Sequence, residues 1–319
     1  MTAVRRSPAG PREGDREPRR IARGTAEGYV YAVPSRATDL IHPGERVEVE
    51  TWDARAGSVA GMPPGVPFDF PVRPPGARSN PLSGPITVQG ACPGDALVVT
   101  VEDIAVADQG WCGGRPIVGL DARAIVRSRA RICAVRDGRV VFSDRISIPL
   151  VPMIGCIGTA SEDGLQPSEA PGRTGGNMDH SIIRAGARVY LPVRHPGAHL
   201  YLGDVHAVQG DGELSGVGLE ISAVITATVD LAEGCSIAWP WVEFEERIAV
   251  LTSGRGFAAA RRSAMEAMMN AVESQLGLEP ADALALISLV GDLRIGQACG
   301  GMDITVRLEM PADLGLRPC

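Results

Sequence analysis

Segment 219–231 alternates apolar and polar residues along its length, and this alternation constrains the fold more than any other feature of the chain. A period of two places one set of side chains on each face of an extended strand, so one face is buried and the other is polar. Shorter runs of the same kind occupy residues 46–51, 96–107, 139–150 and 187–193. These segments predict a mainly β protein, built from antiparallel sheets in a sandwich-like or barrel-like arrangement.

Composition supports many turns between short strands. The chain has 39 Gly and 25 Pro but only 4% aromatic residues, a balance that does not favour a helix bundle. Residues 161–180 are polar and glycine-rich, and we expect a long loop there, of the kind that often carries function.

The pattern changes towards the C-terminus. Apolar residues recur at helical spacing through 256–276, a second helix is expected after Pro280 through Ile287, and a final strand over Asp303–Met310. We therefore expect three parts: a disordered basic tail (1–24), a β-rich catalytic core (25–252) and an α+β portion with two helices packed on that core (253–319).

Charge is unevenly distributed. Residues 1–24 carry seven Arg against three acidic residues, a charge of +4, so a total of −7 leaves −11 on the rest of the chain. The acidic charge of the chain after residue 24 argues against nucleic-acid binding. The sequence has no run of about 18 apolar residues, so no membrane span is predicted. The Arg-rich start has no apolar segment behind it, and the seven Cys residues are scattered without a CxxC pair. We therefore expect reduced thiols and a cytoplasmic location, and we expect no secretory signal.

Lysine is absent: all 31 basic residues are Arg. Schiff-base chemistry, a lysine general base and a P-loop are therefore excluded.

The densest polar cluster is Gly203–Glu213 (GDVHAVQGDGE). If the segment is extended, Asp204 and His206 share a face, with Cα atoms roughly 6–7 Å apart, while His199 has the opposite parity. A strict two-residue turn at Asp211-Gly212 would leave Glu213 roughly 13 Å from His206, and only a wider loop or bulge brings them together. The alternative interpretation is a hairpin tip with solvated charges.

A second cluster, Gly172–Asp179 (GRTGGNMD), places two glycines before a polar segment. Glycine permits close approach of the backbone to a ligand. Asn177 can donate to a carbonyl, and Asp179 can act as a metal ligand or a base. The alternative is an Asx-type turn.

At these residues the chain resembles the acetamidase/formamidase family. Gly203–Glu213 looks like the family's signature, and Tyr190–Val193 with Pro196–Ala198 matches the approach to it. Further matching fragments follow in family order over roughly residues 30–310: Glu50–Ala54 (ETWDA), Asn80–Pro85 (NPLSGP), Gly90–Asp95 (GACPGD), Pro152–Gly155 (PMIG), Gly175–Asp179 (GGNMD) and Asp292–Ile295 (DLRI). The chain departs from the family pattern at Thr174, His195 and His199.

The resemblance implies a β-rich hydrolase that converts a short aliphatic amide to a carboxylate and ammonia. It places Asp204, His206 and Glu213 at the active site, joined by Asn177 and Asp179, with Asp53 as a weaker candidate.

Amide hydrolysis needs an activated nucleophile, a polarised carbonyl and a proton for the leaving amine. The Ser-Ser-Lys and Glu-Lys-Cys solutions require the missing lysine. A Cys-His nucleophile stays possible by composition, although no cysteine neighbours His206 in sequence. The most economical alternative is water activated by a divalent metal, for which zinc is expected, or by a carboxylate alone. We expect metal ligands Asp204 and His206, catalytic residues Glu213 and Asp179, and substrate-binding residues Asn177 and Asp53.

The expected partners are a small amide substrate and a second copy of the chain in a homo-oligomer, a dimer, with neither nucleic acid nor membrane. Two other functions stay open. One is a non-catalytic small-molecule binding protein on the same fold. The other is hydrolysis of an ester or a cyclic amide at the same site.

Overall fold

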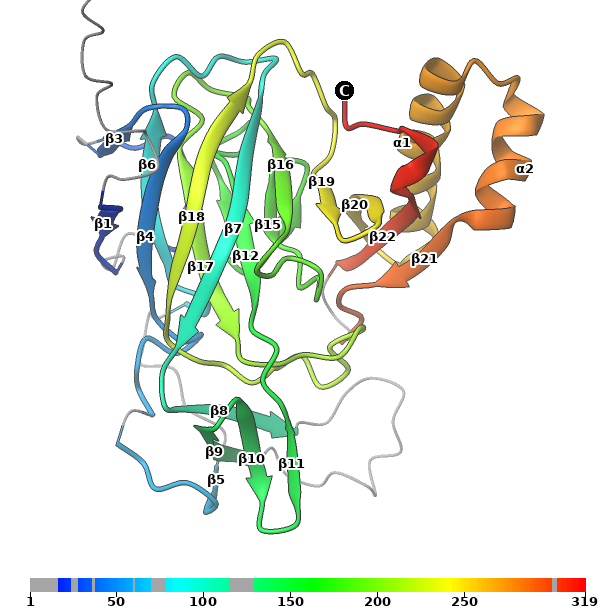
Figure 1. Ribbon diagram of the computed structural model, residues 1–319. Coiled ribbons are helices and arrows are strands. Elements are labelled where there is room, and N and C mark those ends of the chain that lie inside the picture. Colours follow the sequence, from blue (N-terminus) through cyan, green and yellow to red (C-terminus); the bar gives the residue numbers. More distant parts are fainter. Residues whose placement is uncertain are drawn as a thin grey trace, which may run out of the picture.

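The computed structural model describes residues 17–23, 28–35, 38–59, 61–69, 78–114, 129–299 and 303–319. Strands are the predominant secondary structure of the described chain, and the longest of them run side by side through the centre of the molecule (Figure 1). The two α-helices of the described residues lie near the C-terminus. The prediction of a mainly β fold with a helix-containing C-terminal portion is confirmed.

The largest sheet has nine strands, antiparallel except for its first pair. In spatial order they are β1 (Arg19–Ile21), β4 (Glu45–Thr51), β18 (Ala223–Ala232), β7 (Ala96–Val106), β16 (Arg188–Pro192), β19 (Trp241–Phe244), β20 (Arg247–Gly254), β22 (Ile304–Pro311) and β21 (Asp292–Ile295).

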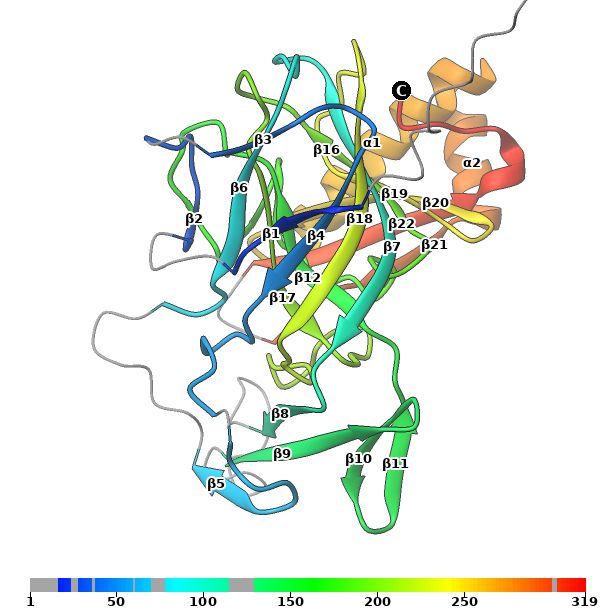
Figure 2. The same cartoon turned by 60° about the vertical axis from the view of Figure 1, so that its left-hand side comes forward.

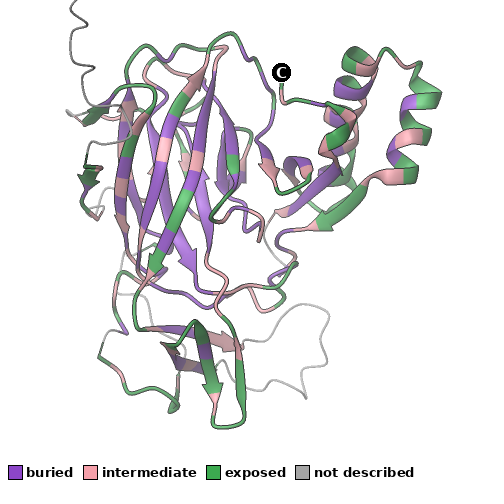
Figure 3. Cartoon of the chain, viewed as in Figure 1, coloured by how far each residue is buried: buried purple, intermediate pink, exposed green. Residues whose placement is uncertain are grey.

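A six-stranded sheet forms the second layer. Its order is β14 (Pro171–Gly172), β15 (Gly175–Asn177), β12 (Met153–Gly158), β17 (Leu200–His206), β6 (Leu82–Val88) and β3 (Asp39–Ile41). Apolar side chains of β4, β7, β16 and β18 pack against those of β6, β12 and β17 in one continuous core. The alternating residues of each strand supply the inner faces of this sandwich, and the burial colouring of Figure 3 shows how little of the central strands reaches solvent.

A smaller five-stranded sheet lies beyond one end of the sandwich (Figures 1 and 2). It comprises β11 (Ile146–Pro149), β10 (Arg139–Ser143), β9 (Arg129–Arg136) and β5 (Pro67–Asp69), with β8 (Gln109–Gly114) also paired to β9. A two-stranded pair, β2 (Val30–Tyr31) with β13 (Gln166–Pro167), completes the strands.

The helices α1 (Phe257–Leu276) and α2 (Pro280–Val290) cover the other face of the nine-stranded sheet, where they share a second apolar core with β20 and β22. Gly277 ends α1 in the left-handed conformation, and Pro280 begins α2, as their sequence positions predict. A short 3₁₀ turn, Ala312–Leu314, follows β22. Neither α-helix in the described ranges combines the length and apolarity that a bilayer span requires.

Several element boundaries differ from expectation. The strand expected from residue 219 begins at Ala223 and has a register shift after Thr226. Residues 161–180 contain the short strands β13, β14 and β15 rather than one long loop. β20 crosses the expected boundary at residue 253, so the C-terminal portion continues the main sheet. Within the expected tail, Arg19–Ile21 already pairs with β4, while residues 1–16 and 24 lie outside the described residues.

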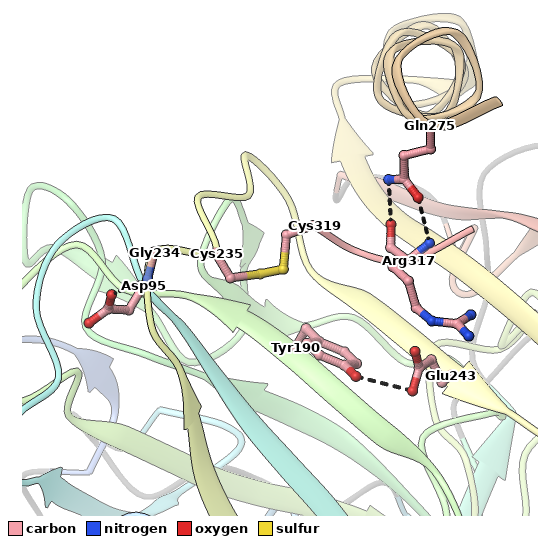
Figure 4. The surroundings of a disulfide bond; sticks show 8 residues. All are labelled: Asp95, Tyr190, Gly234, Cys235, Glu243, Gln275, Arg317 and Cys319. Carbon is pink, nitrogen blue, oxygen red and sulfur yellow. Dashed lines mark hydrogen bonds between the residues drawn. A yellow bond between two sulfur atoms is a disulfide. The ribbon is translucent and has the colours of Figure 1, made fainter. Parts of the chain in front are cut away.

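The expectation that all thiols are reduced is wrong for one pair. Cys235 and Cys319 form a disulfide with a Cα–Cα distance of 5.4 Å (Figure 4). Gln275 of α1 holds the last residues in place, since its amide donates to the carbonyl of Arg317 at 2.9 Å and accepts from its N–H at 2.8 Å. The pair is 84 residues apart in sequence, so spacing gave no indication of it. The other five cysteines form no disulfide.

Candidate active site

The candidate site lies where β12 and β17 of the six-stranded sheet run side by side. Met153 is opposite His206 in this antiparallel pair, and Cys156 is opposite Gly203. Between these partners Asp204 adopts φ 53°, in the left-handed region, which breaks the regular strand. A Cβ on Gly155 would lie 2.5 Å from Asp179 Oδ1, so glycine is required there. Non-glycine residues in the left-handed region, such as Asp204, are concentrated at functional sites.

Asp204 and His206 converge as the strand alternation predicts. His206 Nε2 lies 3.7 Å from Asp204 Oδ1, and both side chains are buried. His206 Nδ1 lies 2.6 Å from Gln209 Oε1, while Gln209 Nε2 donates to the carbonyl of Asp179 at 2.8 Å. Because the amide oxygen of Gln209 faces Nδ1, the ring donates its Nδ1 proton there. Nε2 therefore presents its lone pair to the carboxylates when the ring is neutral.

Glu220 is the carboxylate that sequence analysis did not assign to the site. Its Oε2 lies 3.4 Å from His206 Nε2, and the two residues form an antiparallel bridge. The chain after β17 turns through a wide loop, and the pairing of His206 with Glu220 puts the midpoint of that loop at Glu213. The backbone N–H of Glu213 donates to the carbonyl of Gly210 at 3.2 Å, so the two-residue turn at Asp211-Gly212 forms. It does not continue into a tight hairpin, because Val208 accepts from the N–H of Leu219 at 3.0 Å.

Glu213 is brought back to the cluster by contacts of this loop with the C-terminal part of the main sheet. Gly212 exchanges backbone hydrogen bonds with Gly296 and Ala298 at 3.0 and 2.9 Å. Asp211 accepts two hydrogen bonds from Arg307 of β22, at 3.0 and 2.8 Å. As a result, ligand atoms of Glu213, Asp179 and His206 lie within 4.8 Å of one another. The solvated hairpin tip is excluded, because the Glu213 side chain is buried.

Asn177 and Asp179 enter from β15 and the turn after it. Asn177 Oδ1 lies 3.4 Å from Asn80 Nδ2 and 3.2 Å from Cys156 Sγ, and its Nδ2 faces the carbonyl of Glu169 at 3.5 Å. Asn80 also donates to Asp204 Oδ2 at 2.7 Å. Three acids of the cluster, Asp204, Glu213 and Glu220, line a pocket of about 80 Å³. Its lining also includes Asn80, Trp111, Asn177 and Gln297, while ligand atoms of Asp179 and His206 lie within 4.8 Å of those of Glu213.

Burial and crowding of like charges shift the titration of this cluster. Burial, reinforced by Glu213 and Asp204, raises the pKa of Asp179 well above its usual range. Burial also raises the pKa of Glu220, to about 8, although His206 opposes the shift. For His206, burial alone would lower the pKa, but Glu220 and Asp204 outweigh it and hold the pKa well above its ordinary value. Each shift reduces the excess negative charge of the cluster.

Several acceptor atoms of the cluster have no hydrogen-bond partner in the described part of the chain. They are both carboxylate oxygens of Asp179, Asp204 Oδ1, His206 Nε2 and Glu220 Oε2. Buried acceptors of this kind are normally satisfied, and buried charges are paired or bound to a cation. Two sets of three ligands are close enough to share one ion: Asp204, His206 and Glu220, or Asp179, His206 and Glu213. The donor set fits a divalent cation.

Comparison with known proteins agrees with this geometry. The acetamidase/formamidase family model matches residues 159–311, which contain the four acids and the imidazole of the cluster. The structure is similar to that of the acetamidase of Yersinia enterocolitica, with 30% identity, 94% of each chain covered and a TM-score of 0.81. The chain belongs to the acetamidase/formamidase family. The resemblance predicted from the sequence is thereby confirmed.

Two further relatives show how far the likeness extends. The acetamidase structure of Bacillus halodurans has 29% identity and a TM-score of 0.83, over 93% of this chain and 98% of that one. The acetamidase of Mycolicibacterium smegmatis is 28% identical over 269 residues, or 63% of this chain and 64% of that protein. Over the curated relatives it matches, the chain spans between about half and two thirds of their length.

The structure does not bring Asp53 into the cluster, although its fragment carried part of the likeness to the acetamidase/formamidase family. Its carboxylate accepts from the backbone N–H of Arg55 at 2.8 Å and of Gly57 at 3.1 Å, and from Trp111 Nε1 at 3.4 Å. Asp53 therefore orders its own loop and holds Trp111, which lines the pocket.

The three departures from the family pattern lie outside the cluster. His195 Nε2 lies 2.8 Å from the carbonyl of Ser161, and His199 Nδ1 lies 3.1 Å from Thr87 Oγ1. Thr174 accepts the N–H of Thr159 through its carbonyl at 3.0 Å. The alternation along the strand predicted that His199 points away, and it does.

Proposed function

We propose that this protein is an amidohydrolase that converts a short aliphatic amide, such as acetamide or formamide, to the carboxylate and ammonia. The observation that carries the proposal is the cluster of four carboxyl groups and one imidazole, three of whose acids line a pocket of about 80 Å³. Membership of the acetamidase/formamidase family and the names of the structural neighbours support it.

We infer that Asp204, His206 and Glu220 hold a divalent cation. Their unpartnered lone pairs point at one another, and Glu220 supplies the third ligand that the sequence did not identify. An imidazole ligand favours zinc over magnesium or calcium, so zinc is the proposed identity. When bound, such an ion polarises the amide carbonyl and lowers the pKa of water.

The remaining groups are proposed to move protons and orient the amide. Glu213 removes a proton from the attacking water, whose oxygen bonds to the carbonyl carbon. As the C–N bond breaks, Asp179 delivers a proton to the departing nitrogen, which leaves as ammonia. An amide nitrogen carries two hydrogens, and Asn177 uses one towards Glu169, so the other can donate to the substrate carbonyl.

Cys156 lies at the site, but its surroundings favour the water route over a thiolate nucleophile. The side chain is fully buried, and its Sγ contacts the carbonyl of Ser168 at 3.3 Å as well as Asn177. Burial, with the charges of Asp204 and Asp179, raises its pKa well above the ordinary value. A thiol is a good nucleophile only as the thiolate, which this environment opposes.

The test is ammonia release from acetamide and formamide by the purified protein, with the metal content measured on the same sample. We expect turnover, loss of turnover after chelation, and recovery when zinc is returned. Full turnover by a metal-free preparation would end the zinc proposal but not the hydrolase. Binding of acetamide without ammonia release would instead support the non-catalytic binding protein. The cytoplasmic location and the dimer stay predictions.

A further inference from the structure

A second, larger cavity lies between the five-stranded sheet and the loop that carries Glu213. Its volume is about 980 Å³, at the upper end of the usual range for small-molecule sites. Strands β8, β9 and β10 form one wall, and loop residues from Val208 to Leu219 form the other. Apolar side chains from both walls line it, among them Val140, Phe142, Ile148, Val208, Leu214 and Leu219.

This cavity adjoins the candidate active site. Glu213 and Val217 line both the cavity and the polar pocket of about 80 Å³. Gln209, which orients the ring of His206, also lines the cavity. A molecule in the large cavity therefore lies against the residue that we propose as the base.

The two volumes differ in what they can hold. The polar pocket has room for only about three water molecules at roughly 30 Å³ each, enough for a carboxamide group and little more. An acetamide molecule would leave the larger cavity without any contact to the substrate. The exposed apolar side chains at its walls, Phe142 with 38% and Leu214 with 69% of their surface exposed, would then have no function in binding.

We propose that this cavity binds the apolar part of the substrate's acyl group. The preferred substrates are then primary amides of medium-chain or aryl-substituted carboxylic acids, with acetamide as the smallest and slowest member. This inference rests on the proposed amidohydrolase function. The substituent is placed on the acyl side because ammonia, the other product, carries none.

Two of the charged residues that line the cavity, Arg131 and Asp211, are already engaged within the protein, which agrees with an apolar occupant. Arg131 stacks on the ring of Phe142 at 4.9 Å and donates to its carbonyl at 2.9 Å, so its guanidinium is engaged by the wall itself. Asp211 is paired with Arg307. The aliphatic and aromatic side chains of the walls are the groups that favour a hydrocarbon chain or ring.

The experiment compares kcat/KM for acetamide, propanamide, butanamide, hexanamide and phenylacetamide, measured by ammonia release with zinc-replete protein. A methylene that moves from water into an apolar site contributes about 0.8 kcal/mol, which is about fourfold in kcat/KM. We therefore expect a rise on the order of 100-fold from acetamide to hexanamide. A flat or falling series with active acetamide would overturn this inference and leave the amidohydrolase intact. No ammonia from any amide would refute the amidohydrolase itself.

A variant that fills the cavity tests the location. Gly114 lines the cavity, and a Cβ there meets no atom of the described residues within 4 Å, so Gly114→Trp adds bulk without a clash at Cβ against that part of the chain. We expect it to abolish the gain for hexanamide and to leave kcat/KM for acetamide unchanged. The matched control is Val141→Trp, which adds the same ring at an exposed position that does not line the cavity, and which should keep the gain.

If Gly114→Trp does not fold, Phe142→Ser removes apolar surface from the wall instead and should reduce the gain for phenylacetamide at least severalfold. An unchanged chain-length series in a folded cavity variant would overturn the inference. The same holds if Val141→Trp abolishes the gain, because the cavity would then not be its cause. If the protein is a dimer and a second copy fills the cavity, the series is flat, and crosslinking through this face identifies the copy.

Discussion

Two buried polar clusters lie next to each other, and they differ in how their charge is compensated. Around Arg307, the guanidinium contacts Asp211 through two hydrogen bonds and Glu309 Oε1 at 2.5 Å. Around His206, carboxylates outnumber the one imidazole, and acceptor atoms are unpartnered within the described residues. Asp179 and His180 are consecutive in the chain, yet Asp179 belongs to the His206 cluster and His180 lies against the guanidinium of Arg307.

The pKa directions separate the two clusters. The pKa of Asp211 is lowered and that of Arg307 is raised, since their mutual hydrogen bonds outweigh burial, so both favour their charged forms. Asp179 and Glu220 are shifted the other way, towards their neutral forms, mainly by burial. The first cluster resembles a structural tether that holds the Glu213 loop on β22. The second cluster, around His206, has the shifted pKa values that are typical of candidate functional sites.

The largest expected effect is the loss of turnover in Glu213→Gln. The amide keeps the size of the side chain but cannot accept a proton from water, and general acid–base catalysis contributes about 10² to 10⁴ in rate. Ammonia release should fall by that factor while the thermal unfolding midpoint stays within a few degrees. Asp163→Asn, at an exposed carboxylate remote in sequence from the cluster, is the control and should keep full activity. Near-normal activity in Glu213→Gln would remove Glu213 from the reaction.

Arg307→Met should damage stability instead. It leaves Asp211 and Glu309 without their buried partner. Because 32% of the Asp211 side chain is exposed and Glu309 keeps Arg247 at 3.6 Å, we expect a cost of about 1–3 kcal/mol in the free energy of unfolding. Denaturant unfolding followed by tryptophan fluorescence measures this cost. Arg46→Met breaks an exposed pair with Glu102, at 2.6 Å, and should cost about 1 kcal/mol or less. Equal costs for the two variants would contradict the distinction between tether and surface pair.

The pH dependence of the chelated protein should be opposite to that of a protein stabilised by paired carboxylates. Glu220 has a pKa of about 8 in the folded chain against an ordinary 4.5. Between these values the folded state binds a proton that the unfolded chain has released, so the free energy of unfolding falls as pH rises. The raised pKa of His206 acts in the same direction, above its ordinary value.

Thermal unfolding of the metal-free protein at several values between about pH 5 and 8 measures this slope. Glu220→Gln removes the titrating group and should flatten the curve. Zinc added at pH 8 should restore the midpoint in the wild-type chain more than in the variant, because cation binding displaces the protons. A midpoint that rises with pH in the chelated wild type would show that the cluster is not proton-loaded.

The difference between neighbours on one strand and residues that meet by long-range pairing explains which site residues the sequence could predict. Asp204 and His206 were found because both lie on one strand, where a period of two relates neighbours. Glu220 belongs to the alternating segment 219–231, and no local pattern shows that the chain returns to pair this residue with His206. Asn80, in the bend before β6, and Cys156 of β12 contribute from elsewhere in the sequence, and Cys235 and Cys319 meet across 84 residues. Long-range pairing of this kind leaves no periodic signal in the sequence.

The smallest effect is expected at Cys156, and it separates a wall residue from a nucleophile. Cys156→Ala removes the sulfur contacts with Ser168 and Asn177 but leaves Asp204, His206 and Glu213 in place. If water is the nucleophile, kcat should fall less than about tenfold, because only the orientation of Asn177 is loosened, and the loss of a buried donor costs about 1 kcal/mol of stability. If the thiol were the nucleophile, this variant would lose all turnover, and the wild-type protein would form an acyl-enzyme on Cys156 that a mass measurement detects. Because the pKa of the thiol is raised by burial and by Asp204 and Asp179, the same negative charge that would favour a cation at this cluster also keeps its cysteine in the unreactive thiol form.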